Sequence, residues 1–570
     1  MKNYLFLFLF TWTFAYGAVA KAKEKSGTIK YKVVVNGEER SRYGYTELHY
    51  HQNVVKIQKV RSGNAQQIPT TPDEATYIDL TQEKIFDLAI LNTGNRFHTA
   101  SAIADLPEVE ITEETQEILG YTCKKATLLL FSNRIDLWFT TETGLRGTPY
   151  PQGGLTEGVV LKMVRNGSYE LVADAIEFIK PKKMPALLPE NLGEEVDKVQ
   201  YRARIVDNYV TTVNVFDREQ ISWGNEINNP EGDVSGETYH FAGGTVILKK
   251  VKLPEVTDDY SVFAKIVQYS NGDAYDRTGS VFMIPTDKKL SFLEGLKNGA
   301  KSLPKYLDTQ GKEYQGVIVT DEYTPALELV RFFTPFGIRH FNEKRKVAEV
   351  NWEDSTVYKQ DISYLLPELQ GEAWIGAFIG NYDKGGHILS LDLKYYPGSS
   401  VVREQTKKYW VQPIFNTLNL MEMAGQEYGT MFDGDSLKVT FNVPEGVKNV
   451  RLQYISTGHG GWGGGDEFNQ KSNELFIDGQ KVFTHIPWRS DCAAFRKYNP
   501  ASGNFWNGIS SSDLSRSGWC PGSATNPVTI PLFDMEAGTH QLQVAIPLGQ
   551  REGSSFSAWN ISGVLVGEYE

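Results

Sequence analysis

A glycine-rich stretch between residues 456 and 468 holds the side chains best suited to chemistry. Six glycines there surround His459, Trp462 and an Asp-Glu pair that ends at Glu467. Glycine adopts backbone conformations that other residues avoid, and it lets a ligand approach the main chain closely. A core strand would not tolerate so much glycine, so we expect a loop shaped for binding. Strand-like runs then flank Asp478-Gly479, a strong hairpin signal, which predicts that a sheet holds the loop.

An internal pseudo-repeat adds a second acid in an equivalent position. Residues 251–255 and 441–445 both end in Pro-Glu, and a strand-like run and a loop follow each of them. The chain runs 22 positions from Pro254 to Asp276 and 23 from Pro444 to Glu467. We therefore expect two similar domains that present Asp276 and Glu467 from equivalent loops. Two nearby carboxylates in unequal environments separate their pKa values, so that one can hold a proton.

The elements that must position these acids are predicted to be strands. Short runs with partial period-two alternation, separated by turn residues, indicate an all-β protein. We expect two adjacent jelly-roll-like antiparallel sandwiches, preceded by an N-terminal antiparallel β domain. The boundaries are residues 21–185 for the N-terminal domain, 186–397 for the first sandwich and 398–570 for the second, with a proline-rich linker at 181–189. Residues 200–216 are predicted to be a strand, and residues 291–303 a short amphipathic helix.

The first twenty residues have the pattern of a secretory signal peptide. An apolar run follows Lys2, and Ala-Val-Ala at 18–20 supplies a small-residue cleavage site. No later segment approaches about 18 unbroken apolar residues, so we expect no membrane span. The mature protein should be secreted or periplasmic, and we expect a monomer. A net charge of −12 argues against a nucleic-acid partner.

Three cysteines in an exported chain allow one disulfide and one remaining thiol. Cys492 and Cys520 share a domain and bracket one loop segment, whereas Cys123 lies far away in the N-terminal domain. We therefore expect a bond between Cys492 and Cys520 and a free Cys123.

Several motifs in the second half resemble the peptide-N-glycosidase F family, secreted bacterial amidases that remove N-linked glycans. The resemblance covers residues 236–570, and the extra N-terminal length is similar to the longer type II form. The matching segments are the Gly-His-Gly-Gly-Trp loop at 458–462, Glu467 with Phe468, Arg-Ser-Gly-Trp-Cys-Pro-Gly at 516–522, Asp-Ala-Tyr-Asp-Arg at 273–277, Arg-Phe-Phe-Thr-Pro-Phe at 331–336, and Lys384 with Gly385.

The resemblance implies hydrolysis of the amide between asparagine and the first GlcNAc of an N-linked glycoprotein or glycopeptide, without a metal or cofactor. Asp276 matches the principal catalytic aspartate, which would orient or activate water. Glu467 would share the water network. The implied substrate contacts are oxygen-binding donors from Arg277 and Arg516, sugar stacking on Tyr275, Trp462 and Trp519, and a ligand or proton-relay role for His459.

Two departures from the family pattern stand out. The cysteine pairs that bracket the two acids in the short-form amidase are missing, so these loops must be braced otherwise. A further family glutamate falls near Ile379 and Gly380, neither of which can act as a carboxylate. Its role is either absent, or Asn381 or Asp383 substitutes.

Three other classes remain open. A copper monooxygenase needs clustered His and Met ligands, and the one His-x-His is His49-Tyr50-His51, far from the other motifs. A glycosidase could use the same two carboxylates on the sugar C1–O bond. A glycan-binding module could have kept the loops without activity.

Overall fold

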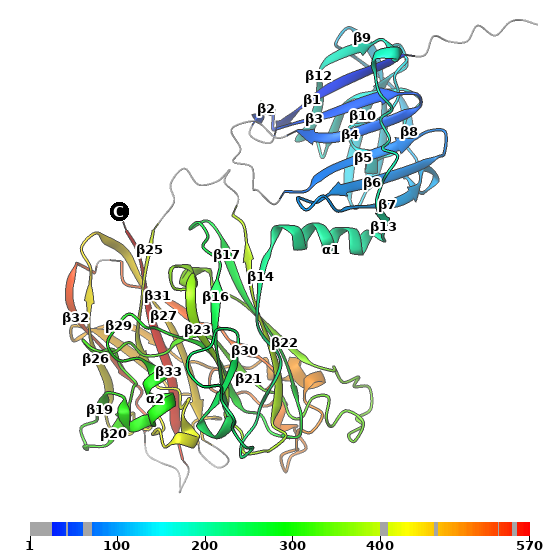
Figure 1. The fold of residues 1–570 in the computed structure, drawn as a ribbon. Coiled ribbons are helices and arrows are strands. Elements are labelled where there is room, and N and C mark those ends of the chain that lie inside the picture. Colours follow the sequence, from blue (N-terminus) through cyan, green and yellow to red (C-terminus); the bar gives the residue numbers. More distant parts are fainter. Residues whose placement is uncertain are drawn as a thin grey trace, which may run out of the picture. The chain divides into compact units, whose positions relative to one another are not determined.

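The computed structural model describes residues 25–41, 44–60, 71–398, 408–460, 465–533, 535–549 and 556–569. The chain forms two compact units, Met1–Tyr209 and Val210–Glu570 (Figure 1). The predicted signal peptide at residues 1–20 lies outside the described residues.

The first unit is built on one sheet of thirteen strands. Its pairings are antiparallel except the one between β13 and β7. Alternate side chains such as Ile29, Tyr31 and Val33 of β1 are buried, which is the period-two pattern expected of a half-buried strand. The N-terminal antiparallel β domain predicted from the sequence is therefore confirmed. Its strands are β1 (Ser26–Val35), β2 (Glu38–Glu39), β3 (Tyr45–His51), β4 (Val54–Val60), β5 (Asp73–Asp79), β6 (Lys84–Ile90), β7 (Arg96–Ala102), β8 (Glu110–Ile118), β9 (Tyr121–Leu130), β10 (Asn133–Thr140), β11 (Val159–Arg165), β12 (Tyr169–Ile179) and β13 (Glu194–Glu195).

The first unit ends in a helix where the sequence predicted a strand. Helix α1 (Lys198–Tyr209) buries Tyr201 and Ile205, four positions apart, against Phe97 of β7. This spacing places both side chains on one helical face, so the strand prediction for residues 200–209 was wrong. Leu188, in the predicted linker, also packs on the sheet. The division between the units consequently falls after Tyr209 and not after residue 185.

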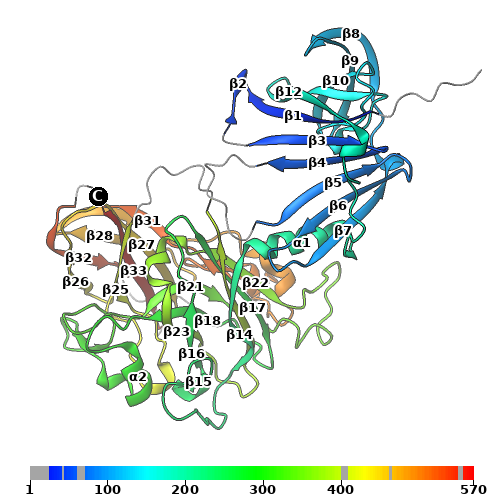
Figure 2. The same ribbon diagram turned by 45° about the horizontal axis from the view of Figure 1, so that its top comes forward.

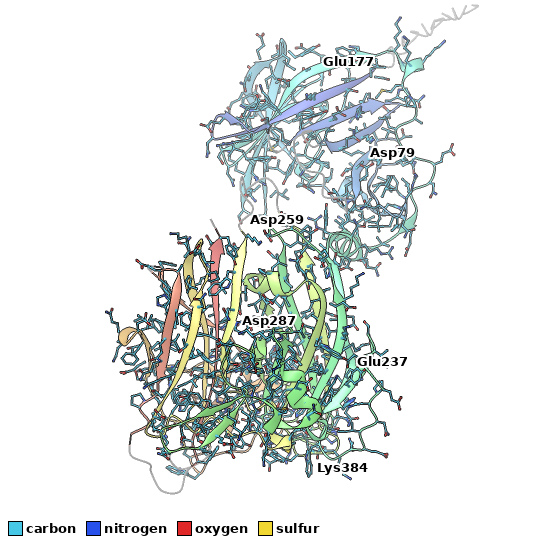
Figure 3. All side chains as sticks on the ribbon, turned by 60° about the vertical axis from the view of Figure 1, so that its left-hand side comes forward. Asp79, Glu177, Glu237, Asp259, Asp287 and Lys384 are labelled. Carbon is cyan, nitrogen blue, oxygen red and sulfur yellow. A yellow bond between two sulfur atoms is a disulfide. The ribbon has the colours of Figure 1, made fainter. Side chains whose placement is uncertain are left out.

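The second unit contains two antiparallel sandwiches, as predicted. In the first, a four-stranded sheet (β14-β24-β17-β22) packs on a six-stranded sheet (β15-β16-β23-β18-β21-β30). Apolar side chains fill the space between these sheets, while exposed charged residues such as Glu237 and Lys384 lie outside (Figure 3). The strands are β14 (Thr211–Ile221), β15 (Thr238–Phe241), β16 (Val246–Leu253), β17 (Ser261–Ser270), β18 (Thr278–Ile284), β21 (Leu327–Phe333), β22 (Thr356–Asp361), β23 (Gly371–Ile379), β24 (His387–Tyr396) and β30 (Ala524–Thr525).

The second sandwich has two four-stranded sheets, β25-β33-β27-β31 and β26-β32-β28-β29. Its core includes Trp559 of β33, Val439 of β26 and Leu475 of β28. The predicted hairpin at Asp478-Gly479 is confirmed between β28 and β29, with both residues at positive φ. The strands are β25 (Tyr409–Asn416), β26 (Ser436–Val443), β27 (Val447–His459), β28 (Asn473–Ile477), β29 (Gln480–His485), β31 (Val528–Pro531), β32 (Gly538–Ala545) and β33 (Ala558–Tyr569), with a separate pair β19 (Lys305–Leu307) and β20 (Glu313–Gln315).

The predicted helix at residues 291–303 is confirmed as α2 (Phe292–Asn298), followed by a 3-10 turn at Ala300–Ser302. Phe292 and Leu296 are buried against Phe282 and Trp374 of the first sandwich. Gly299, at φ +89°, ends the regular helix.

The two sandwiches share a core, and strands of both lie side by side in Figure 2. Strand β30 comes from the second half of the sequence but pairs with β21 in the first sandwich. Arg331 of β21 is fully buried, pairs with Glu328 at 2.7 Å and donates to the main-chain oxygen of Asn560 in β33. Charged side chains buried this deeply must be fully partnered, so this network fixes the sandwiches against each other.

Candidate active site

Arg516 joins the two acids that the pseudo-repeat singled out. Asp276 lies in the loop from β17 to β18, and Glu467 lies in the loop from β27 to β28. Each loop connects one sheet of its sandwich to the facing sheet, so the two positions are equivalent, as expected. Arg516 Nη2 is 3.2 Å from Asp276 Oδ2, and Arg516 Nε is 2.9 Å from Glu467 Oε1. The acids therefore share one cationic partner.

The guanidinium of Arg516 is held in a fixed position. Arg516 is 1% exposed, and its nitrogens donate to the main-chain oxygen of Ser511 at 2.9 Å and to Ser511 Oγ at 3.2 Å. We expected Arg516 to bind oxygens of a substrate. Its burial and its four contacts instead make it the group that positions the two carboxylates.

Burial shifts the titration of both acids. The side chains of Asp276 and Glu467 are only 16% and 17% exposed. Removal from water raises the pKa of Glu467 to about 8, with Arg516 opposing this change and Asp276 adding to it. Burial also raises the pKa of Asp276, against the opposing charges of Arg516 and Arg277. The two acids interact and therefore titrate as a pair, and Glu467 keeps a proton near neutral pH.

Asp273 braces the loop that carries Asp276. Arg277 Nε donates to Asp273 Oδ2 at 2.7 Å, and His387 Nε2 lies 3.4 Å from the same oxygen. Burial opposes ionisation of this 3% exposed residue, yet hydrogen bonds from His387 and Arg277 hold the pKa of Asp273 well below its usual range. An ionic brace therefore holds this loop, which contains no cysteine.

A second brace holds the loop of Glu467. Its neighbour Asp466 is 3% exposed and accepts a hydrogen bond from Trp559 Nε1 at 2.8 Å. The main-chain oxygen of Glu467 accepts from the N–H of Ser517 at 2.9 Å. These contacts tie the loop to β33 and to the segment of Arg516.

Trp519 and His459 form the floor beneath Arg516. Trp519 is 4% exposed, stacks on Phe333 with ring centroids 4.3 Å apart, and lies 4.7 Å from the Arg516 guanidinium. It has no open face for a sugar, which corrects the stacking role expected for it. His459 stacks on Trp519, and burial lowers its pKa to about 3, helped by the charge of Arg331. The imidazole is therefore neutral, and its Nε2 lies 2.9 Å from Thr457 Oγ1.

Two exposed tyrosines lie beside Arg277. Tyr275 is 62% exposed and Tyr382 is 53% exposed, with the Arg277 guanidinium 5.1 and 5.4 Å from their rings. Tyr275 and Arg277, which we expected to contact the substrate, flank Asp276 in the chain. Trp462, the other expected stacking residue, lies outside the described residues.

Asn381 and Asp383, the two proposed substitutes for the missing glutamate, both bond to the main chain. Asn381 is fully buried and donates to the main-chain oxygen of Ile379 at 2.9 Å. Asp383 Oδ1 accepts from two main-chain N–H groups at 2.8 and 2.9 Å, so it fixes a turn.

Glu422 supplies a carboxylate next to Gly380. A Cβ atom at Gly380 would lie 3.4 Å from Glu422 Oε2. The same carboxylate accepts hydrogen bonds from the hydroxyls of Tyr382 and Tyr428. Sequence reasoning missed Glu422 because it lies 40 positions beyond Tyr382 in a separate loop, and no local pattern links the two.

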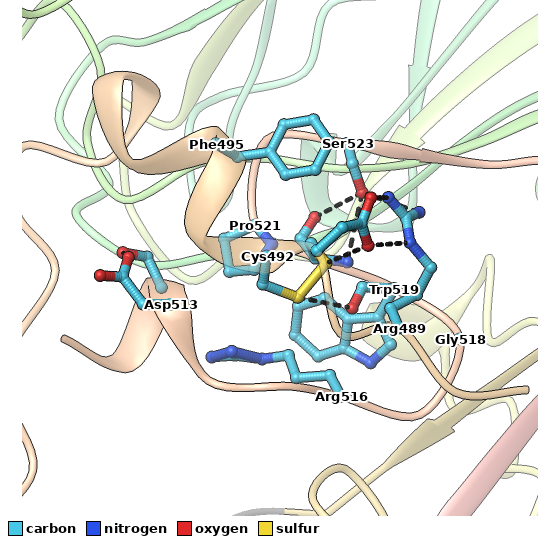
Figure 4. Close-up of a disulfide and its surroundings, with 12 residues drawn as sticks. Arg489, Cys492, Phe495, Asp513, Arg516, Gly518, Trp519, Pro521 and Ser523 are labelled. Carbon is cyan, nitrogen blue, oxygen red and sulfur yellow. Dashed lines mark hydrogen bonds and ion pairs between the residues drawn. A yellow bond between two sulfur atoms is a disulfide. The ribbon is translucent and has the colours of Figure 1, made fainter. Parts of the chain in front are cut away.

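The predicted disulfide between Cys492 and Cys520 is confirmed, with Cα atoms 5.1 Å apart. Figure 4 shows it beside Trp519 and Arg516. The bond therefore joins the two ends of the segment that delivers Arg516. Cys123 is buried and unpaired, also as predicted.

Other candidate sites lie elsewhere. His49 and His51 each contact a hydroxyl, Thr28 Oγ1 at 2.9 Å and Ser26 Oγ at 2.7 Å. Within the described ranges, no three His, Cys, Asp or Glu side chains are grouped to hold a metal. A cavity of about 370 Å³ lined by His485, Trp488 and Arg489 contains none of the predicted site residues. In the part of the chain that the structure describes, no helix is both long and apolar enough to cross a membrane.

Comparisons with known proteins match nearly the whole chain. Family models described as peptide-N-glycosidase F, N terminal and C terminal, match residues 212–395 and 427–566, and N-glycanase peptide, N-terminal domain, matches residues 29–203. A solved structure of PNGF-II is 42% identical with a TM-score of 0.86, covering 96% of this chain and 100% of that chain. PNGase F, described as a glycosylasparaginase from Flavobacterium meningosepticum, is 14% identical with a TM-score of 0.42, covering 63% and 96%. A search of curated proteins found no match.

Proposed function

Because this chain belongs to the peptide-N-glycosidase F family, we propose that it hydrolyses the amide bond between asparagine and the first GlcNAc of N-linked glycans. The reaction converts the asparagine to aspartate and releases the intact glycan. The single observation that carries the proposal is the pairing of Asp276 and Glu467 through Arg516.

The chemistry needs a base for water and an acid for the leaving nitrogen. Water adds to the side-chain amide carbon, and Asp276 accepts its proton. The C–N bond then breaks, and Glu467 gives a proton to the departing nitrogen of the glycan. A pKa of about 8 keeps Glu467 protonated at neutral pH, which suits a proton donor. Burial raises the pKa of Asp276, which strengthens it as a base, and the charges of Arg516 and Arg277 oppose this shift.

The surface beside Asp276 has the composition that a saccharide requires. Tyr275 and Tyr382 present aromatic faces for sugar C–H groups, while Arg277 and Glu422 supply a donor and an acceptor for hydroxyls. Trp223, 40% exposed, extends this surface through an edge contact with Tyr382. We infer that the glycan lies here.

The disulfide supports a location outside the cytoplasm. Bonds of this kind persist in oxidising compartments such as the periplasm and the cell exterior. Cys492 and Cys520 form one next to the candidate site. We infer that the protein is secreted or periplasmic and acts there on glycoproteins.

Product analysis of a denatured N-glycoprotein tests the proposed reaction. The peptide should carry aspartate at the former glycosylation site, and the released glycan should keep both core GlcNAc residues. A glycosidase that cuts within the core would leave one GlcNAc on asparagine. A glycan-binding module would leave the glycoprotein intact. Either of the last two results refutes the amidase assignment.

A further inference from the structure

A tryptophan lies almost wholly in solvent on a turn near the candidate site. Trp506 is 97% exposed, and Ile509 on the same turn is 42% exposed. Folding gains nothing from exposing so large an apolar side chain, and apolar side chains gathered on a surface mark interaction sites.

The turn has a defined backbone. Asn504 and Ser510 form a bridge, the N–H of Phe505 donates to the oxygen of Ile509 at 2.8 Å, and that of Gly508 donates to the oxygen of Phe505 at 2.9 Å. Gly508 adopts a φ of +85°, which the reversal requires. A side chain on such a turn loses little backbone freedom on contact with a partner.

The turn is attached to the catalytic cluster at two points. At its base, the N–H of Ser511 donates to the oxygen of Gly503 at 2.8 Å, and Ser511 is the residue that holds Arg516. At its side, Phe505 packs edge-on against Phe468 with centroids 5.8 Å apart, and Phe468 lies 4.9 Å from the Arg516 guanidinium. Trp506 is therefore displayed at a fixed place relative to Glu467.

The composition of the turn favours a polypeptide over a sugar. Residues 499–510 contain no charged residue, and their polar side chains are asparagine amides and serine hydroxyls, which can bond to the main-chain N–H and C=O groups of a polypeptide. The surface beside Asp276 combines aromatic faces with Arg277 and Glu422 and fits the glycan arm. A glycosylated asparagine joins a glycan arm and a peptide arm, which meet at the amide. Side-chain contacts lead from Glu467 to Trp506 on one side and from Asp276 to Tyr382 on the other. A broad apolar face also tolerates the variable sequences that flank glycosylated asparagines.

We propose that Trp506 binds the polypeptide that flanks the glycosylated asparagine and thereby favours substrates with long peptide arms. This inference rests on the proposed amidase function. It assigns the turn at Asn504–Ser510 a role in substrate selection without a role in bond cleavage.

The test compares two substrates that carry the same glycan, a blocked glycotripeptide and a blocked glycopeptide of about ten residues. In Trp506→Ala, KM for the long substrate should rise about tenfold, as for the truncation of an interface tryptophan, while kcat and the short-substrate KM stay unchanged. Trp506→Phe should keep most of the preference for length. Leu307→Ala, at another exposed apolar residue, is the matched control, since Leu307 is 59% exposed on β19.

The outcomes separate this inference from the amidase proposal. An equal KM rise for both substrates would assign Trp506 to the glycan arm and overturn the inference, as would no change for either. Because Trp506 buries almost nothing, the melting temperature of Trp506→Ala should equal that of the wild type. A wild type that releases glycan from neither substrate would refute the amidase proposal itself, and the inference with it.

Discussion

Arg516 and Asp276 lie 3.2 Å apart although 240 positions separate them in the sequence. Their contact exists because β30 crosses to the first sandwich and the disulfide holds the segment between Cys492 and Cys520. The candidate active site is thus a product of the packing between the two sandwiches. The residues that hold each acid in place therefore matter as much as the acids themselves.

Arg516→Ala should lower kcat by about 10²-fold, because Asp276 and Glu467 would lose the guanidinium that positions them. It should also lower the free energy of unfolding, because removing one partner leaves the other charges buried without compensation. Glycan release and thermal unfolding measure the two effects. Arg451→Ala is the control, because Arg451 is 25% exposed and lies 3.9 Å from Glu568. A variant with wild-type turnover would remove Arg516 from the site.

The rate of glycan release should fall as the pH rises through about 8, where Glu467 loses its proton. The free energy of unfolding should change in the same direction. The folded protein keeps a proton on Glu467 that the unfolded chain has already lost above its ordinary pKa, so the free energy of unfolding decreases toward pH 8. Glu467→Gln should remove this part of the pH dependence and most of the activity. A rate that stays flat to pH 10 argues against Glu467 as proton donor.

Asp273→Asn should lower the free energy of unfolding by about 3 kcal/mol at pH 7, because Arg277 and His387 lose a 2% exposed anionic partner. The folded pKa of Asp273 lies below its unfolded value, so this stability is present above the ordinary aspartate pKa and disappears as the pH falls through the folded value. The difference between wild type and variant should therefore shrink in acid. Denaturant unfolding at several pH values measures it, with the exposed Asp217→Asn as control.

Glu422→Gln should raise KM for a glycopeptide that carries a GlcNAc disaccharide by about fivefold, the loss of a charged acceptor for a sugar hydroxyl. The KM for a glycopeptide that carries a single GlcNAc should change less. Arg277 contacts Tyr382, and Tyr382 in turn contacts Glu422, so Glu422 lies farther from Asp276 along these contacts than Arg277 does. Tyr428→Phe separates sugar recognition by Glu422 from structural support of Glu422, since Tyr428 donates to the same carboxylate. Equal effects on both substrates would place Glu422 at the reacting sugar.

The sequence allowed the all-β class, the two sandwiches, the disulfide and the equivalence of the Asp276 and Glu467 loops to be predicted. Each of these features produces a local or repeated pattern in the amino-acid sequence. Arg516 was assigned to the substrate because a sequence does not reveal burial. The role of Asp273 was missed because its partner His387 lies on the distant strand β24, and Glu422 was missed because its contact with Tyr382 joins separate loops. Residues 200–209 were read as a strand although Tyr201 and Ile205 stand four positions apart, because two buried side chains make only a short helical pattern.

Glycan release in water enriched in oxygen-18 tests the central claim most directly. With the wild type, the former glycosylation site should become aspartate that carries one heavy oxygen, and the released glycan should keep both core GlcNAc residues. Asp276→Asn should slow this conversion by about 10²- to 10⁴-fold, because an amide cannot accept the proton of the attacking water. An asparagine that keeps one GlcNAc and gains no heavy oxygen, or an Asp276→Asn variant with wild-type turnover, would contradict the account.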